Sequence, residues 1–235
     1  MLVQMLLIWL AANFAPHVVV YLLRRKLYFA LKPAAGMAAE LSLMALNLTL
    51  PIVALVALPP RHPLPLYQAL VWRWEGWSTI GWGLLGLAAI LGSAEIINRL
   101  VGTPPFSYGG GLDRPLVLPQ DWTLLLLLLA LWIVTTLGEE IMFRGYVQTG
   151  LSERYGAFVG LLGGALPFAL RHTPADLYWG WGASAGQWTS RLVQLAATAL
   201  ILGWIRHLSQ STVSTWVAHL LLWISVVIIN AVGGA

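Results

Sequence analysis

Long apolar runs alternate with short polar segments along the whole chain. Continuous apolar runs of about 20 residues match the length of a membrane-spanning helix, and they lack the strict alternation of apolar and polar positions that a membrane strand shows. The pattern therefore predicts an all-α, polytopic membrane helical bundle with about seven to eight transmembrane helices. The expected spans are residues 1–23, 36–58, 78–97, 122–147, 156–167, 188–205 and 212–229.

Proline, glycine and charged residues predict where these helices end. Residues 103–120 form an expected loop, and Asp121 is a suitable N-cap for the helix that follows. We expect that helix to break at Gly150 and the polar residues after it, and Pro167 to interrupt the next helix. A stretch rich in Trp and Gly predicts a further loop over 173–186. Small residues recur every fourth position before the proline, a spacing that predicts close helix packing, at Gly156, Gly160 and Gly164.

The composition agrees with a membrane protein. Of the 235 residues, 59% are hydrophobic and 9% are charged, whereas soluble domains carry roughly 25% charged residues. The net charge of +4 and the pI of 9.7 would suggest nucleic-acid binding in a soluble protein. Here the basic residues stand singly between apolar segments, so we expect no nucleic-acid partner. The exception is a cluster that predicts a cytoplasmic loop after the first span, formed by Arg24, Arg25, Lys26 and Lys32. The absence of cysteine excludes thiolate catalysis and thiolate metal sites.

Two adjacent carboxylates and an arginine lie at the end of the leucine-rich span. Ionisable groups at membrane depth cost ~2.5–3.5 kcal/mol each on insertion scales, so they usually mark function. Glu140 and Arg144 are four residues apart, which places them on one helix face as an expected ion pair. Glu139 is rotated by about 100° from that face, so its carboxylate is left for another partner.

Histidines supply the remaining candidate chemistry. His172 and His219 fall within or against predicted membrane helices after the two glutamates. Together with Glu139 they would form a set that activates water by general-base catalysis and stabilises an oxyanion. The same three side chains would equally bind zinc with one open position, and the residues leave both chemistries open. A solvated or packing role is expected for the others, His17, His62 and His207.

Three motifs follow one another in the second half of the chain: Glu139-Glu140-x-x-Phe143-Arg144-Gly145, Phe168-x-x-x-His172, and His219 in the last helix. Their order resembles the CPBP family of intramembrane proteases, which includes CAAX prenyl endopeptidases and proteins linked to bacteriocin processing and immunity. The resemblance covers about residues 121–230. No long repeat or soluble segment divides the chain, so we expect a single membrane domain over 1–235, with N-terminal helices in 1–120 and catalytic core helices in 121–230.

The resemblance implies a role for each motif residue. Glu139 would activate the attacking water, and Glu140 would pair with Arg144. His172 and His219 would help to bind the water and to stabilise the tetrahedral intermediate.

One position departs from the family pattern. The family usually has Asn or Asp four residues after the last histidine, where this chain has Trp223. An indole offers one N–H donor and no acceptor, so it does not reproduce an amide. Asn230 would lie about 16 Å further along the helix axis than the histidine, too far to substitute. Asp176, four residues after His172, would only add polarity.

The positions of the motifs also set a condition on the fold. A span between Glu139 and His172 should carry these residues to opposite membrane faces. They meet only if the helix with Glu139 continues past Arg144, or if the segment around Pro167 is broken or re-entrant. We expect the first, a helix that extends to about residue 147, with a water-filled cavity that reaches the site.

The sequence therefore favours an intramembrane endopeptidase, a CAAX-type peptide hydrolase that depends on glutamate or on a metal, with zinc as the one cofactor to consider. Its expected partners are the lipid bilayer and a peptide or protein substrate, either membrane-anchored or a protein C-terminus. The alternative, which Trp223 favours, is a non-catalytic membrane scaffold such as an immunity, chaperone or regulatory protein. A transporter is disfavoured because no inverted repeat is visible. Many arginines, few lysines and no cysteine favour a prokaryotic plasma membrane; the sequence sets no oligomeric state.

Overall fold

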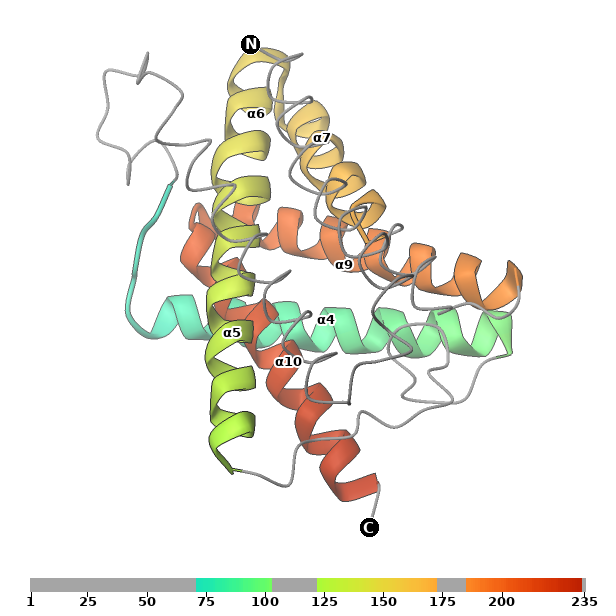
Figure 1. Ribbon diagram of the computed structural model, residues 1–235. Coiled ribbons are helices and arrows are strands. Elements are labelled where there is room, and N and C mark those ends of the chain that lie inside the picture. Colours follow the sequence, from blue (N-terminus) through green and yellow to red (C-terminus); the bar gives the residue numbers. More distant parts are fainter. Residues whose placement is uncertain (1–70, 103–121, 173–184, 234–235) are drawn as a thin grey trace, which may run out of the picture.

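The computed structural model describes residues 71–102, 122–172 and 185–233. Every regular element in these ranges is a helix, which confirms the expected all-α class (Figure 1). In chain order the helices are α4 (Trp77–Val101), α5 (Trp122–Glu140), the π-helix η1 (Ile141–Gln148), α6 (Thr149–Tyr155), α7 (Ala157–Leu170), α9 (Ala185–Ser209) and α10 (Thr212–Gly233). The spans expected at 1–23 and 36–58, the loop at 103–120 and Asp121 lie outside the described residues.

Two of the described helices, α4 and α9, are long and apolar enough to cross a membrane by length and composition. The helix α7 and the first part of α10 are shorter apolar helices. The spans predicted at 78–97, 188–205 and 212–229 fall inside α4, α9 and α10. Because α9 begins at Ala185, the loop predicted over 173–186 extends two residues too far. The predicted total of seven to eight spans includes segments outside the described ranges.

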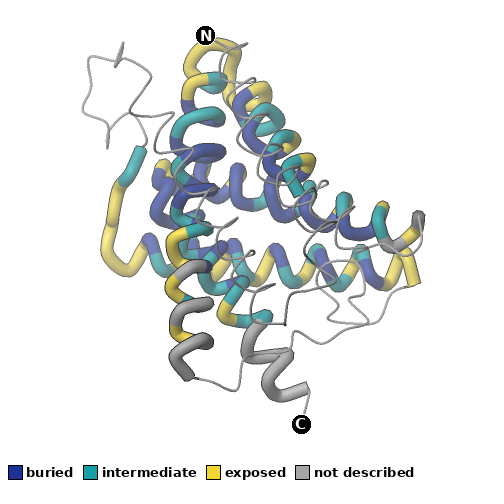
Figure 2. The backbone as a smooth tube through the Cα atoms, viewed as in Figure 1, coloured by how far each residue is buried: buried dark blue, intermediate teal, exposed yellow. Residues whose placement is uncertain are grey.

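Two hydrophobic clusters hold the described helices together. One joins α4, α9 and α10 through buried side chains, namely Ile90, Leu202, Ala218 and Leu222. The other joins η1, α7 and α9 through Met142, Phe143, Ala165, Phe168 and Ala199. Figure 2 shows that buried residues gather where the helices cross, while the turn between α6 and α7 is exposed. The second cluster places η1 and α7 face to face.

The helices α5, η1 and α6 follow one another without a break and form one long rod (Figure 1). The prediction that this helix continues past Arg144 is therefore confirmed, and the predicted end at Gly150 is wrong. Gly150 has no neighbouring atom within 4 Å of a Cβ position, so it costs the helix only about 1 kcal/mol relative to alanine. The rod ends instead at Gly156, whose φ of 90° is a conformation that glycine adopts without strain.

The glycines of α7 bring this helix against the rod. A Cβ at Gly160 would lie 2.6 Å from the carbonyl oxygen of Gln148, and a Cβ at Gly164 would lie 3.0 Å from that of Phe143. The predicted packing role is confirmed for these two glycines. It is wrong for Gly156, which has no neighbour within 4 Å of its Cβ position and makes the turn.

Pro167 does not interrupt α7, which runs on to Leu170, so the predicted break is wrong. A proline removes one backbone donor, but its carbonyl can still accept. The carbonyl oxygen of Pro167 accepts the N–H of Arg171 at 3.0 Å, and that of Ala169 accepts the N–H of His172 at 3.3 Å. The last turn therefore holds Arg171 and His172 at the end of α7.

Candidate active site

The π-helix η1 follows the two glutamates directly. A π-helix has i→i+5 hydrogen bonds and is rare, and it occurs frequently at functional sites. The hydroxyl of Thr149 donates to the carbonyl oxygen of Arg144, five residues back, at 3.2 Å. The helix buries most of its residues, namely Met142, Phe143, Arg144, Gly145 and Gln148. Two adjacent residues of this helix contact neighbouring helices: Phe143 packs with buried residues of α7 and α9, and Arg144 donates to α9.

Glu140 and Arg144 form the predicted ion pair. The Nη1 atom of Arg144 lies 3.2 Å from Oε1 of Glu140, and neither side chain is more than 1% exposed. The Nη2 atom of the same guanidinium donates to the carbonyl oxygen of Ala199 on α9 at 3.2 Å. Its central carbon lies 4.4 Å from the centre of the Phe168 ring on α7. Arg144 therefore neutralises Glu140 and ties η1 to two other helices.

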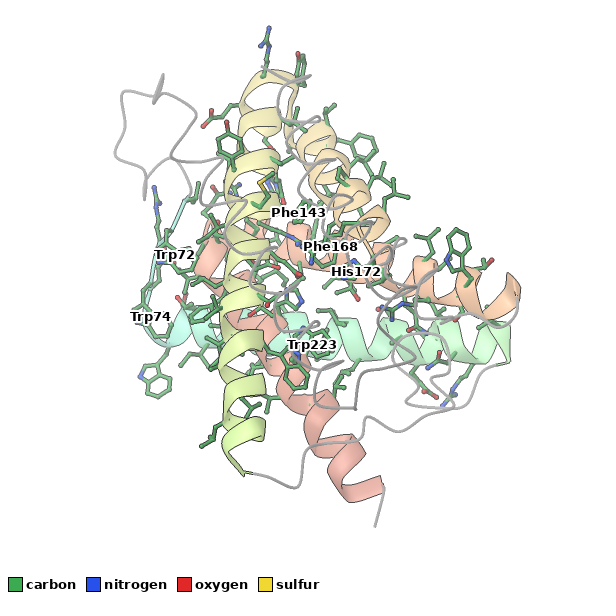
Figure 3. The ribbon with its side chains drawn as sticks, viewed as in Figure 1. Trp72, Trp74, Phe143, Phe168, His172 and Trp223 are labelled. Atoms are coloured by element: carbon green, nitrogen blue, oxygen red, sulfur yellow. The ribbon has the colours of Figure 1, made fainter. Side chains whose placement is uncertain are left out.

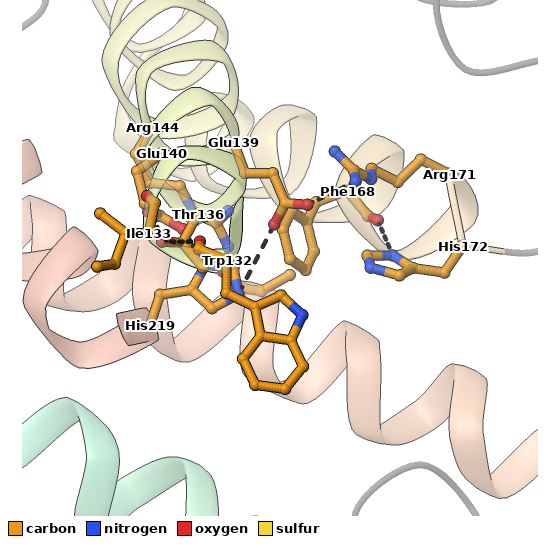
Figure 4. Close-up of polar contacts among 11 residues, drawn as sticks. Trp132, Ile133, Thr136, Glu139, Glu140, Arg144, Phe168, Arg171, His172 and His219 are labelled. Atoms are coloured by element: carbon orange, nitrogen blue, oxygen red, sulfur yellow. Dashed lines mark hydrogen bonds and ion pairs between the residues drawn. The ribbon is translucent and has the colours of Figure 1, made fainter. Parts of the chain in front are cut away.

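His219 reaches both glutamates from α10. Its Nδ1 lies 2.8 Å from Oε1 of Glu140, and its Nε2 lies 3.7 Å from Oε2 of Glu139. Because an ionised carboxylate only accepts hydrogen bonds, the Nδ1–H of His219 donates to Glu140. This hydrogen bond orients the imidazole so that Nε2 faces Glu139 (Figure 4).

Glu139 faces the end of α7, away from Arg144, the cationic partner of Glu140 (Figure 4). Its Oε1 lies 2.5 Å from Nη2 of Arg171, and the two side chains are 8% and 12% exposed. Its Oε2 is the oxygen that faces His219. The rotation predicted from helix geometry is confirmed, because the two adjacent carboxylates have different cationic partners.

The spacing Phe168-x-x-x-His172 has a physical reason at the end of α7. The Nδ1–H of His172 donates to the carbonyl oxygen of Phe168 at 2.9 Å, in the last turn, where helix carbonyls lack intrahelical partners. The Phe168 ring centre lies 5.1 Å from that of His172 and 5.8 Å from that of His219. In both imidazoles Nδ1 is bound to an acceptor within the protein, so Nε2 is the nitrogen offered to a ligand.

The structure brings the five predicted site residues into one cluster. Direct contacts link four of them, namely Glu139, Glu140, Arg144 and His219. His172 joins the four through the Phe168 ring, and Figure 4 shows the Glu139 carboxylate between the two imidazoles. In Figure 3 the same region lies where the rod, α7 and α9 converge, with Phe143, Phe168 and His172 labelled.

Arg171 is the candidate residue that the sequence reading missed. It forms the ion pair with Glu139, although 32 positions separate the two in the numbering. A signal was present, because Arg171 directly precedes His172 and is a cation at the end of an apolar helix. No helix spacing relates it to Glu139, so only the fold reveals its partner.

Trp223, one turn after His219, packs against α5. Its ring stacks on that of Trp132, with centres 5.0 Å apart and planes 21° apart. The residue at the position where the family usually has Asn or Asp thus joins two helices beside the site (Figure 3), and its indole offers no acceptor.

The other polar candidates, Asn230 and His207, are not part of this cluster. Asn230 is eleven residues after His219 in α10, which is about 16 Å along the axis. His207 is half-buried and packs on the ring of Trp204, with centres 5.7 Å apart, as a packing role predicts. Positions outside the described residues are Asp176, His17 and His62.

The zinc alternative requires Glu139, His172 and His219 as ligands. No group of three or more His, Asp or Glu side chains in the described ranges is arranged to hold a metal ion. The guanidinium of Arg171 already occupies Oε1 of Glu139, and its positive charge opposes a divalent cation at the same oxygen. The donor set therefore fits zinc poorly.

Residues 121–224 match the family described as type II CAAX prenyl endopeptidase Rce1-like. The matched segment contains every motif residue, and the match confirms the resemblance to CAAX-type proteases. This is a family of proteases and of membrane proteins. No curated protein and no solved structure matches the chain.

Proposed function

We propose that this chain, which is similar to the CAAX-type intramembrane proteases over residues 121–224, hydrolyses a peptide bond at the membrane with Glu139 as the general base. The observation that carries the proposal is the asymmetric environment of the Glu139 carboxylate. Arg171 holds Oε1, while Oε2 faces Nε2 of His219. A water molecule beside these two atoms would meet a proton acceptor and an oriented imidazole together.

The reaction follows from this geometry. Oε2 of Glu139 accepts a proton from water as the water oxygen attacks the carbonyl carbon of the peptide bond. The resulting tetrahedral intermediate carries an oxyanion. Glu139 then returns the proton to the amide nitrogen, the C–N bond breaks, and a carboxylic acid and an amine leave.

The two imidazoles support this sequence through Nε2. A neutral ring accepts a hydrogen bond from the attacking water, and a protonated ring donates one to the oxyanion. Nε2 of His219 faces Glu139, and His172 packs on the Phe168 ring that also contacts His219 (Figure 4). Glu140 and Arg144 take no proton in the reaction and act by orienting His219.

The substrate proposed is a peptide that is membrane-anchored or a protein C-terminus. Apolar helices surround the site, and α4 and α9 are long enough to cross a bilayer. We place the protein in the plasma membrane of a prokaryote as a multi-pass protein. The ion pairs and oriented imidazoles around Glu139 support a peptidase over the non-catalytic scaffold that Trp223 suggested.

The test compares wild type with Glu139→Gln, purified in detergent, on a mixed library of lipidated and unlipidated peptides. Products are identified by mass spectrometry, and folding is checked by thermal unfolding. We expect the wild type to cleave, and the cleavage rate of the variant to be lower by about 10²–10⁴-fold, since removal of a general base costs that much. The matched control is Glu95→Gln, which removes a carboxylate that is paired with the exposed Arg99 on α4 and should cleave normally.

Chelators distinguish the two hydrolytic chemistries in the same assay. Because Arg171 occupies Glu139, we expect full activity after treatment with a strong zinc chelator. Loss of activity that added zinc restores would establish the metal-dependent alternative. A wild type that cleaves nothing in the library, or a Glu139→Gln variant that cleaves at the normal rate, would refute the proposed function.

A further inference from the structure

Arg171 lies where α7 ends and meets Glu139 from outside the rod. Its Nη2 atom is 2.5 Å from Oε1 of Glu139, and its side chain is 12% exposed. Its guanidinium carbon lies 5.9 Å from the centre of the Phe143 ring on η1. An ion pair this close, between two largely buried side chains, restricts the rotamers of both partners.

The two arginines of the site are arranged reciprocally. Arg144 comes from η1 and lies over the Phe168 ring of α7, while Arg171 comes from α7 and faces the Phe143 ring of η1. The two rings contact each other edge to face, with centres 5.4 Å apart. Each arginine also pairs with one of the two adjacent glutamates. The contact between η1 and α7 thus brings Arg171 to Glu139, whereas Arg144 reaches Glu140 within the rod itself.

The two pairs differ in what the carboxylate is left to do. Glu140 is fully buried and is held by both Arg144 and His219. Glu139 has one partner within hydrogen-bond distance in the described part of the chain, and that partner is Arg171. Nε2 of His219 is too distant to hold Glu139, at 3.7 Å from its Oε2.

We infer that Arg171 is a positioning residue for Glu139. By binding Oε1, the guanidinium fixes the carboxylate rotamer and directs Oε2 toward His219, where the attacking water is activated. The inference rests on the proposed function, and it assigns a role to a residue outside the Glu-Glu, Phe-x-x-x-His and last-helix motifs. A side chain that positions a base affects the rate of the chemical step more than it affects substrate binding.

The first experiment compares the steady-state kinetics of wild type, Arg171→Gln and Arg171→Lys. We expect Arg171→Gln to lower kcat by ~10–100-fold, as misplacement of a catalytic group does, with KM within about twofold. Arg171→Lys keeps the charge and should recover part of kcat. Added guanidinium should also raise the activity of Arg171→Ala, because it can bind in the space that the side chain leaves. The control Arg99→Gln removes the exposed arginine of α4 and should have normal kinetics.

The second experiment needs no activity. Thermal unfolding is measured for wild type, Glu139→Gln, Arg171→Gln and the double variant. If the two side chains interact, the Tm loss of the double variant is smaller than the sum of the single losses, by at least about 2 °C. Additive losses, or an Arg171→Gln enzyme with normal kcat, would overturn the inference. A wild type without peptidase activity would refute both the proposed function and the positioning role. If the Tm losses were then still non-additive, the Glu139–Arg171 pair would have a purely structural role.

Discussion

Adjacent residues in this protein have different tasks because a helix turns by about 100° per residue. Glu140 points into the rod's contact with α9 and α10, where Arg144 and His219 bind it. Glu139 points to the end of α7, where Arg171 binds one of its oxygens. The buried pair supports the site and the less enclosed carboxylate performs the proposed chemistry.

The buried pair predicts a strong, asymmetric effect on stability. Glu140→Met would leave the buried Arg144 charge without its carboxylate, which costs about 3–5 kcal/mol. We expect a fall in Tm on the order of 10 °C, measured by thermal unfolding in detergent. The Tm of the double variant Glu140→Met, Arg144→Met should fall by less than that of Glu140→Met, because no unpaired arginine charge remains.

An exposed pair on α4 is the control for this prediction. Glu95 and Arg99 have the same four-residue spacing and a 2.8 Å contact, but the arginine is 79% exposed. Glu95→Met should change the free energy of unfolding by no more than about 1 kcal/mol. Equal losses of stability in Glu140→Met and Glu95→Met would show that the buried pair of Glu140 with Arg144 is not formed.

Among the helices, the contact of α7 with η1 decides the geometry of the site. Gly160 and Gly164 let the two backbones approach closely, and the phenylalanines fill the space beside them. This approach brings the end of α7, with its arginine and histidine, to the glutamates.

The glycines of α7 provide a test of that contact. Gly164→Ala would place a Cβ 3.0 Å from the carbonyl oxygen of Phe143, so the two backbones must separate by a few tenths of an ångström, at a cost of about 1–3 kcal/mol. We expect a lower Tm and a lower kcat, measured on the same preparation. Gly150→Ala is the matched control, because its Cβ meets no atom within 4 Å and alanine favours the helix by about 0.5–1 kcal/mol. A lower Tm for Gly150→Ala, together with an unchanged Tm for Gly164→Ala, would contradict the close packing of α7 against η1.

At the scale of the whole molecule, polar groups of the site are enclosed by helices that suit a bilayer. The mean hydropathy of the chain is +0.77, and apolar side chains such as Phe158 and Leu100 are exposed on the described helices. Exposed apolar surface of this kind marks sites of contact with a membrane or with another protein.

Membrane integration is predicted from this surface. When the protein is expressed in a bacterium, we expect it in the membrane pellet after an alkaline wash and in the supernatant only after detergent treatment. Immunoblotting of both fractions provides the measurement. Release by the alkaline wash alone would mean that the chain is peripheral and would exclude a site within the bilayer.

What the sequence by itself determined is local. Composition and run length predicted helices, and the spans predicted at 78–97, 188–205 and 212–229 were correct to within a few residues, whereas the helix predicted over 122–147 runs on to Tyr155. The four-residue spacing predicted the pair of Glu140 with Arg144, because an ion pair within one helix depends only on helix geometry. Gly150 and Pro167 were wrongly predicted to break helices. A glycine costs a helix interior about 1 kcal/mol and a proline about 3 kcal/mol, and neither cost ends the helix here.

The tertiary structure decided which side chain meets Glu139. The partner, Arg171, lies on another helix, and its position depends on the glycine contacts of α7 and on the π-helix that precedes them. It also decided that Trp223 stacks on Trp132. Neither contact follows from spacing along one helix, because the distance between side chains on different helices depends on how those helices pack.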